Sequence, residues 1–266
     1  MRFSIITINY NNNEGLRRTI DSVIGQSSRD FEYIIVDGGS TDGSVEVIKD
    51  NAAMIDYWVS ERDKGIYHAM NKGVAQAHGE YCIFMNSGDC FYDDTVLERI
   101  LRLKEEDDII VGRVMSNKKQ LLFAPPCREI SLYYLYSGTV PHQSSFIKTE
   151  LLRKYPYDEG LKIVSDWKFY VQAIIKGNCT IRFIDELVAR FDMDGVSTSN
   201  PDIMWKEKTQ VLSELFPPRV IADYQHIKDS ECLTYTITPL LRQHYRVDII
   251  LYKIGMFLLR LIKNGI

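Results

Sequence analysis

The stretch Tyr81-Cys82-Ile83-Phe84-Met85-Asn86-Ser87-Gly88-Asp89 decides the fold, because an apolar run breaks off into small polar residues and one carboxylate. A strand that ends in this way offers its tip to a hydrated ligand or a cation instead of continuing the sheet. A second apolar run ends in the same style upstream, at Val36-Asp37-Gly38-Gly39-Ser40-Thr41-Asp42-Gly43. Two such tips side by side in one sheet predict a site for a large, oxygen-rich, negatively charged ligand.

Around these two tips, strand-like and helix-like segments alternate over the first 115 residues. We expect strands at 3–8, 31–36, 55–59, 81–85 and 108–114, and helices at 14–26, 44–51, 66–78 and 94–104. Strands separated by helices of this length are typical of βαβ units with right-handed crossovers. The predicted fold class is therefore α/β with a mostly parallel sheet. Ligands of such sheets bind at the carboxyl ends of the strands, where both polar tips lie.

The regular alternation ends near residue 117, and prolines punctuate the chain from there onward. We expect a helix at 166–176, short strands at 180–184 and 187–191, and a polar loop at 192–200. The adjacent prolines 217 and 218 mark a boundary. The sequence thus predicts an α/β half at 1–115, a second half of the same domain at 116–216 and a C-terminal helical extension at 217–266.

Composition and charge argue against several classes of function. The formal net charge of -4 is poorly suited to binding nucleic acid. The 5 cysteines are scattered, which favours buried thiols in a reducing compartment over zinc ligands or disulfides. The N-terminal residues become polar too soon for a signal peptide. We therefore expect a cytoplasmic protein.

The last part of the chain, residues 240–262, is apolar but carries Arg246, Lys253 and Arg260. These charges interrupt the run too often for a transmembrane span. They favour a basic amphipathic helix that lies on the inner face of the cytoplasmic membrane. The alternative is a helix that packs on the domain or in a homodimer.

A series of motifs runs through the first 90 residues. In order, they are Ser4 to Asn11, Gln26, Tyr33 to Gly43, Ser60 to Tyr67, Ala69 to Gly73, Gly79 to Tyr81 and Asn86 to Asp89. Jointly they resemble the inverting family 2 glycosyltransferases, above all the bacterial enzymes that build exopolysaccharide, capsule or O-antigen units. The resemblance implies the GT-A fold, a Rossmann-like, mostly parallel sheet flanked by helices. It also implies that 1–115 bind a nucleotide sugar and 116–216 an acceptor.

The activity that this resemblance implies is the transfer of a hexosyl or N-acetylhexosaminyl group from a nucleotide sugar, with uridine as the expected base. The expected acceptor is a hydroxyl of a glycan or of a lipid-linked molecule. Seven side chains are expected to bind the donor: Thr7, Asn9, Asp37, Asp63, Asn71, Asn86 and His142. Thr7, Asn9 and Asp37 stand at strand tips and have the donors and acceptors to bind base or ribose. For Asn71 a place on the helix surface stays open, and for His142 a structural role.

Asp89 is expected to hold a divalent cation, Mg²⁺ or Mn²⁺, which would bridge the diphosphate. Relatives carry an Asp-x-Asp motif, and its two acidic positions are Asn86 and Gly88 here, so that Asp89 alone remains. Gly38 likewise stands where many relatives have an acid that reads uracil. The first departure concerns the cation site and suggests weaker metal binding, or a metal whose coordination is completed by the ligand, water and a later residue. The second leaves the identity of the base open.

The general base is expected in the second half, because inversion needs a carboxylate that removes the proton of the acceptor hydroxyl. Asp166, in Ser165-Asp166-Trp167, stands at the place that matches the family's base. An N-cap is the alternative interpretation of Asp166. Residues 192–199 resemble a mobile segment that closes over the donor.

Three other hypotheses compete with a transferase. A non-catalytic nucleotide-sugar-binding or assembly subunit would explain the reduced metal motif, but it has no need of a base at Asp166. A nucleotidyltransferase would need a Gly-rich loop with Arg or Lys after the first strand, and residues 9–15 are not such a loop. A dinucleotide dehydrogenase would need G-x-G-x-x-G at that place.

Overall fold

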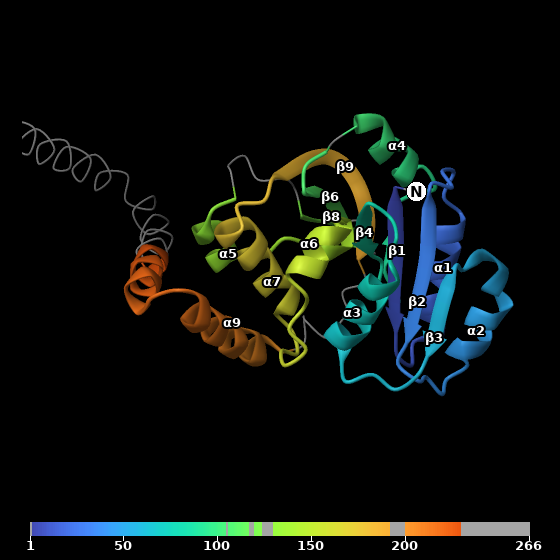
Figure 1. The fold of residues 1–266 in the computed structure, drawn as a ribbon, viewed down its shortest axis with the longest axis horizontal. Helices are drawn as coiled ribbons and strands as arrows, with labels where there is room; N and C mark the ends of the chain where they lie inside the picture. The colour runs from blue at the N-terminus through green and yellow to red at the C-terminus, as the bar shows by residue number, and fades with distance from the viewer. Residues whose placement is uncertain (1, 105, 117–119, 124–129, 192–199, 230–266) are drawn as a thin grey trace, which may run out of the picture. The chain divides into compact units, whose positions relative to one another are not determined.

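The computed structural model describes residues 2–104, 106–116, 120–123, 130–191 and 200–229. Within these ranges the strands form one 9-stranded sheet in the order β3-β2-β1-β4-β8-β6-β9-β5, with β7 paired to β6 (Figure 1). The strands are β1 (Phe3–Asn9), β2 (Phe31–Asp37), β3 (Tyr57–Ser60), β4 (Tyr81–Phe84), β5 (Cys90–Phe91), β6 (Ile109–Ser116), β7 (Leu121–Phe123), β8 (Ser145–Lys148) and β9 (Ile181–Phe191).

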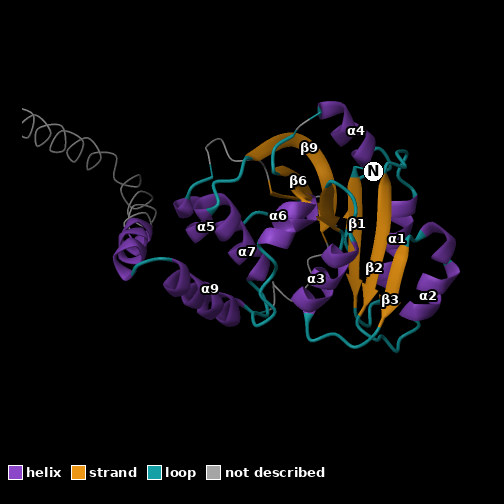
Figure 2. Cartoon of the chain, in the orientation of Figure 1, coloured by secondary structure: helices purple, strands orange, loops and turns teal. Residues whose placement is uncertain are grey.

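Helices flank the sheet on both sides (Figure 2). The described helices are α1 (Asn13–Ile24), α2 (Ser44–Asp50), α3 (Ile66–Gln76), α4 (Val96–Leu103), α5 (Leu132–Ser137), α6 (Thr149–Lys154), α7 (Ser165–Tyr170) and α9 (Pro201–Leu215). Short helical turns lie at η1 (Ala52–Met54) and η2 (His142–Ser144), and η3 (Val171–Lys176) continues α7 as a π-helix. The predicted α/β class is confirmed.

Strand β1 shows why the helices divide between the two faces, because its side chains alternate. Phe3 and Ile5 belong to a buried cluster with residues of α1, α2 and α4. Ile6 points to the other face, where its side chain packs so closely on α3 that Gly73 has no room for a side chain. The strand is therefore buried on both faces, as expected for the centre of a parallel sheet.

The parallel part of the sheet brings the polar tips together. β1 pairs in parallel with β2 and β4, and β2 pairs in parallel with β3. In this register Asn9 lies opposite Asp37, and Asp37 lies opposite Ser60. Past the end of β4, the amide of Ser87 donates to the carbonyl of Ile8 at 3.1 Å. The tips of all these strands thus share one edge, as predicted.

The second half differs from the prediction in two elements. The two strands expected at 180–184 and 187–191 are one strand, β9, which pairs in parallel with β6 through a register shift. A β-bulge allows one long strand to stay paired with its neighbour across a break in its alternating pattern. From the sequence alone, such a break looks like the boundary between two short strands. The helix expected at 166–176 is present as α7 followed by η3.

Residues up to Val211 form one compact unit, and a second begins at Leu212. Within the second unit, residues 218–229 are helical. The predicted loop at 192–199 and the amphipathic segment 240–262 lie outside the described residues. In the part of the chain that is described, no helix has the length and apolar character needed to cross a membrane. The assignment of separate donor and acceptor halves stays a prediction.

Candidate functional site

A cleft of about 1100 Å³ opens at the carboxyl ends of β1 and β4. Pockets for small ligands usually have volumes of about 300–1,000 Å³, so this one has room for a ligand as large as a nucleotide. Six of the predicted site residues line it: Asn9, Asp63, Asn86, Asp89, His142 and Asp166. They come from elements as far apart in the sequence as β1 and α7. The fold therefore brings residues from both halves of the chain to one cleft.

The side chains of Asn86, His142 and Asp166 form a continuous line of contacts across the cleft. Asn86 Nδ2 lies 3.2 Å from His142 Nε2, and His142 Nδ1 lies 3.0 Å from Asp166 Oδ2. Burial lowers the pKa of His142, but the hydrogen bond and negative charge of Asp166 outweigh it, so that the pKa is raised. The tip of β4 is thereby connected to the start of α7.

Asp166 is the second residue of α7, and its side chain remains 17% exposed to the cleft. Its Oδ1 accepts a hydrogen bond from the Trp167 amide at 2.9 Å and lies 3.1 Å from the Tyr67 hydroxyl. The N-cap of α7 is Val164, so the N-cap interpretation of Asp166 is wrong. A carboxylate held in this way on three sides, yet open to the cleft, can accept a proton from a hydroxyl group placed there.

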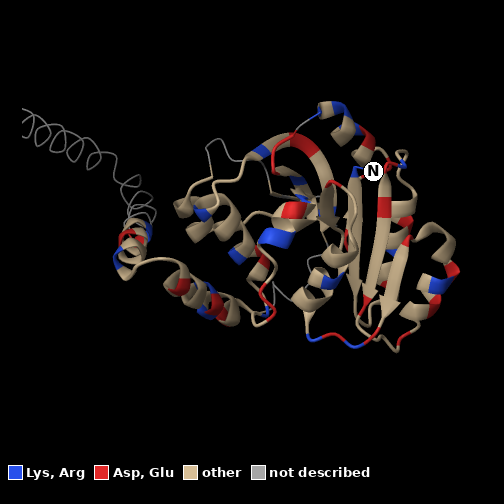
Figure 3. Ribbon diagram, viewed as in Figure 1, with Lys and Arg blue, Asp and Glu red and all other residues tan. Residues whose placement is uncertain are grey.

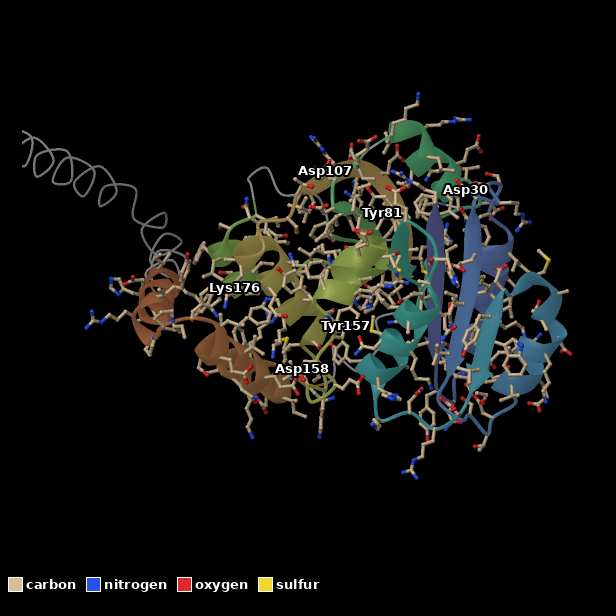
Figure 4. All side chains as sticks on the ribbon, in the orientation of Figure 1. Asp30, Tyr81, Asp107, Tyr157, Asp158 and Lys176 are labelled. Carbon is tan, nitrogen blue, oxygen red and sulfur yellow. The ribbon has the colours of Figure 1, made fainter. Side chains whose placement is uncertain are left out.

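An aromatic cluster packs beneath the surface between α3, β4 and α7, next to Asp166. Tyr157, labelled in Figure 4, is 3% exposed and lies between α3, β4 and α7. Its ring centroid lies 5.6 Å from that of Tyr67, 5.5 Å from that of Phe84 and 5.8 Å from that of Phe169. Tilted and edge-on aromatic pairs of this kind add to the gain from burial. The cluster therefore fixes α7 against α3 and β4.

Asp89 is only 5% exposed where it meets the cleft, and α1 holds the turn that carries it. The Thr19 hydroxyl accepts a hydrogen bond from the Gly88 amide at 3.0 Å and lies 2.7 Å from the carbonyl of Asp89. Gly88 has a φ of 107°, in the left-handed region that favours glycine. An acidic side chain at position 88 would be strained in this backbone conformation.

The donor set at this corner suits a cation that shares its coordination with a ligand. Among the described residues, no group of three or more His, Cys, Asp or Glu side chains is placed to hold a metal ion. Asn86 Oδ1, however, is a buried oxygen to which no described group donates a hydrogen bond. One carboxylate, that of Asp89, and one amide oxygen fit Mg²⁺, which takes few protein ligands and completes its shell with phosphate and water.

Asp37 is fully buried and is placed behind the cleft, although it was expected to bind base or ribose. Its carboxylate accepts hydrogen bonds from Asn9 Nδ2 (2.7 Å), Ser60 Oγ (2.6 Å), the amides of Gly39 and Ser40 (3.1 and 2.9 Å) and Ser40 Oγ (2.6 Å). Burial raises the pKa of Asp37, but these hydrogen bonds outweigh it and lower the pKa. Asp37 therefore joins the tips of β1, β2 and β3.

Thr7 and Asn71 are also placed behind the cleft. Thr7 is fully buried, and its hydroxyl donates to the carbonyl of Met85 at 2.8 Å. Asn71 donates to the carbonyl of Tyr157 at 2.8 Å and accepts from the amide of the same residue at 3.0 Å. Asn71 is thus a half-buried residue of α3 whose side chain anchors a loop of the second half.

The side chain of Asp63 lies beside Gly38, the glycine at the position where an acidic residue was expected to contact uracil. A Cβ atom at Gly38 would lie 3.4 Å from Asp63 Oδ2 and 3.2 Å from the ring of Tyr10. The other oxygen of Asp63 accepts from Lys72 Nζ at 2.8 Å and lies 3.1 Å from His68 Nδ1. A carboxylate oxygen therefore stands beside position 38 after all, supplied by the loop between β3 and α3.

Four basic side chains at the cleft were missed by sequence reasoning: Arg18, Arg62, Lys64 and Lys162. Acidic and basic side chains are interspersed over the coloured part of the ribbon (Figure 3). Arg62 and Lys64 lie in the motif Ser60 to Tyr67, on either side of Asp63. Their position next to a predicted site residue could have identified them from the sequence. These cations favour an anionic ligand in the cleft.

Comparisons with known proteins identify the family of this chain. A family model described as glycosyl transferase family 2 matches residues 4–169. An uncharacterized glycosyltransferase of Mycobacterium tuberculosis (strain H37Rv) is 34% identical over 203 residues, covering 73% of this chain and 76% of the relative. A PGL/p-HBAD biosynthesis glycosyltransferase of Mycobacterium bovis (strain BCG) is 27% identical over 200 residues, covering 73% and 77%.

Solved structures share the fold at lower identity. Residues 1–349 of S. aureus TarS in complex with UDP-GlcNAc match with a TM-score of 0.66 at 19% identity, covering 80% of this chain and 66% of that one. The chain spans 39% of the longer TarS chain. The mannosyltransferase PcManGT from Pyrobaculum calidifontis, in complex with GDP-Man and Mn²⁺, matches with a TM-score of 0.54 at 18% identity, covering 71% and 56%. These likenesses confirm the GT-A fold.

Proposed function

Because this chain belongs to glycosyl transferase family 2, we propose that it transfers a sugar, with inversion, from a nucleotide sugar to a hydroxyl of a glycan or lipid-linked acceptor. The observation that carries the proposal is that Asp89 and Asp166 line the same cleft, one at the tip after β4 and the other on α7. A donor held at the first carboxylate can therefore present its anomeric carbon to an acceptor hydroxyl beside the second.

In the proposed reaction, Asp166 takes the proton from the acceptor hydroxyl as its oxygen attacks the anomeric carbon. The new bond to the acceptor oxygen forms while the bond to the diphosphate oxygen breaks on the opposite face, which inverts the configuration. The nucleoside diphosphate leaves with the bonding electron pair. Bound at Asp89 and Asn86 Oδ1, a divalent cation (Mg²⁺ or Mn²⁺) would supply positive charge for this leaving group.

We propose a uridine donor from the position of Asp63. A carboxylate oxygen accepts hydrogen bonds from N–H groups, and uracil has such a donor at N3. Asp63 Oδ2 stands beside Gly38, where relatives carry the acid that reads uracil. Arg18, Arg62 and Lys64 line the cleft and offset the charge of the diphosphate. The TarS structure with UDP-GlcNAc has the same fold, which supports this choice of donor.

The sugar we propose is a hexosyl or N-acetylhexosaminyl group, and the process is surface polysaccharide synthesis at the inner face of the cytoplasmic membrane. The second candidate function is a non-catalytic nucleotide-sugar-binding subunit. It is favoured by one observation: among the described residues, no group of three or more His, Cys, Asp or Glu side chains could hold a metal ion. The polar line from Asn86 to Asp166 favours the transferase, since binding alone does not need it.

Two experiments test the proposal. Thermal unfolding with a panel of UDP-GlcNAc, UDP-glucose and GDP-mannose, each with and without Mn²⁺, should show stabilisation by a uridine donor that increases with the cation. Release of the nucleoside diphosphate should then fall about 10²- to 10⁴-fold in Asp166→Asn, with donor binding kept, because only the proton acceptor is lost. Intact transfer by this variant would remove Asp166 as the base. No turnover by the parent protein with any donor would favour the binding subunit.

A further inference from the structure

A buried carboxylate on α9 holds the segment that leads into the helix of Asp166. Glu207 is 8% exposed and stands beyond residues 4–169, the part matched by the family model. Its Oε1 accepts the amide of Lys162 at 2.7 Å, and its Oε2 accepts the amides of Ile163 at 3.0 Å and Val164 at 3.3 Å. One carboxylate thus receives three consecutive peptide N–H groups.

The same segment is fixed from the opposite side by α3. The Tyr67 hydroxyl donates to the carbonyl of Ile163 at 2.6 Å. Lys162 and Ile163 also line the cleft. Residues 162–164 are therefore held at their N–H groups by α9 and at a carbonyl by α3, and Lys162 and Ile163 line the cleft together with Asp166.

The position of α7 depends on this segment at its first turn. Val164 is the N-cap of α7, and its side chain makes no capping hydrogen bond. The amide of Val164 donates to Glu207, so the carboxylate of another helix takes over part of the role of a cap. A shift of the segment would move Asp166 relative to the tips of β1 and β4, which are held separately by Asp37 and Thr19.

The three hydrogen bonds to Glu207 join backbone N–H groups to a carboxylate. Hydrogen bonds to an ionised acceptor are about twice as strong as neutral ones. Truncation of Glu207 would leave three peptide N–H groups without their acceptor at once. The next residue adds to the docking of the helix, since Lys208 Nζ donates to the carbonyl of Gly138 and lies 4.8 Å from the ring centroid of Trp167.

We infer that Glu207 is a positioning residue of the transfer reaction, which sets the place of Asp166 against the donor by binding the backbone of residues 162–164. The inference rests on the proposed function, because it assigns Asp166 as the base. It makes α9 part of the acceptor side of the enzyme, although this helix lies outside the matched family region. A displacement of about 1 Å at a reacting group can lower a rate about 100-fold.

The test uses the full chain with Glu207→Gln and Glu207→Ala. Asp202→Asn, a charge-matched change at an exposed acid of the same helix, is the control. Hydrogen exchange should speed up at the amides of 162–164 in Glu207→Ala and stay unchanged in β1 and β4. The kcat for nucleoside diphosphate release from UDP-GlcNAc, UDP-glucose or GDP-mannose should fall at least about tenfold, with the donor KM within about twofold. Glu207→Gln, which keeps one acceptor oxygen, should lie between Ala and the parent.

The outcomes separate this inference from the proposed function. Parental kcat and parental exchange in Glu207→Ala would overturn the positioning role while leaving the transferase in place. Equal losses of donor affinity and kcat would show a general structural role and would also overturn it. A parent chain that turns over none of the three donors, although the exchange of 162–164 responds to Glu207→Ala, would overturn the proposed function and this role with it.

Discussion

At the scale of single residues, a side chain that ends a strand or opens a helix was expected at the cleft, and the structure places some of these side chains there and buries others. Asp89 and Asp166 follow such boundaries, and both line the cleft. Asp37 and Thr7 follow the same pattern but are fully buried. The partners of Asp37 come from three strand tips, and this convergence is a property of the folded chain. Glu207 had no sequence signal, because its partners are backbone amides 43 to 45 residues away.

Asp89→Ala is expected to abolish the part of the thermal stabilisation by UDP that depends on Mn²⁺, because it removes the carboxylate proposed to bind the cation. The measurement is the Tm with UDP, with and without the cation, taken for each variant against its own ligand-free value. Glu14→Ala, a change at an exposed acid of α1, is the control and should keep the parental increment. An unchanged response to Mn²⁺ in Asp89→Ala would rule out Asp89 as the ligand.

Glu32 offers a pH-dependent prediction away from the cleft. Burial raises its pKa, but hydrogen bonds from the Ser4 hydroxyl and from the backbone and side chain of His78 and the amide of Gly79 outweigh it, so that the pKa is lowered. A carboxylate with a lowered pKa stabilises the fold above its unfolded pKa, which is about 4.3 for Glu, and the gain is lost as the pH falls through the lower folded value.

Glu32→Gln is therefore expected to lower the free energy of unfolding at pH 7 and to change it little at strongly acidic pH, so that the variant is less sensitive to acid than the parent. Urea unfolding from pH 7 down to about pH 3 measures both slopes. Parallel pH profiles for the two proteins would show that the carboxylate of Glu32 does not contribute in this way.

At the scale of elements, the first half of the sheet was predictable because each strand and helix there is a single unbroken pattern. β6 was predictable too, but β9 was expected as two strands because its pairing with β6 contains register shifts, and β5, which has only 2 residues, was not expected. Short or bulged strands have too few residues for a period to show. Such segments become strands because they pair with other strands of the sheet that lie far away in the sequence.

The contact of α3 with β1 gives a prediction at this scale. An added Cβ at Gly73 would lie 2.4 Å from Cγ2 of Ile6, which is fully buried. Alanine in a helix gains about 1 kcal/mol over glycine from propensity, whereas overpacking of a core costs about 1–3 kcal/mol. The clash should win, so Gly73→Ala should lower the free energy of unfolding by up to about 2 kcal/mol in a urea titration. A more stable variant would show that α3 can move away from β1 freely.

At the scale of the whole molecule, the described part of the chain contains the proposed donor site, the proposed base and the helix proposed to position that base. An acceptor that is lipid-linked would have to reach this cleft from a membrane surface. The segment 240–262 is the part of the sequence suited to such a surface, since it combines a long apolar run with Arg246, Lys253 and Arg260. Membrane attachment and catalysis would then belong to different parts of one chain.

Deletion of residues 240–262 is expected to abolish binding to vesicles that contain anionic lipid and to leave nucleoside diphosphate release from a soluble donor unchanged. Each basic residue near an anionic surface contributes about 1 kcal/mol, which salt screens. Binding of the full chain should therefore weaken at high ionic strength and on neutral vesicles, as measured by co-sedimentation. A chain that binds equally well without the segment would refute the anchor, and a deletion that converts a dimer to a monomer in light scattering would show that the segment serves a homodimer instead.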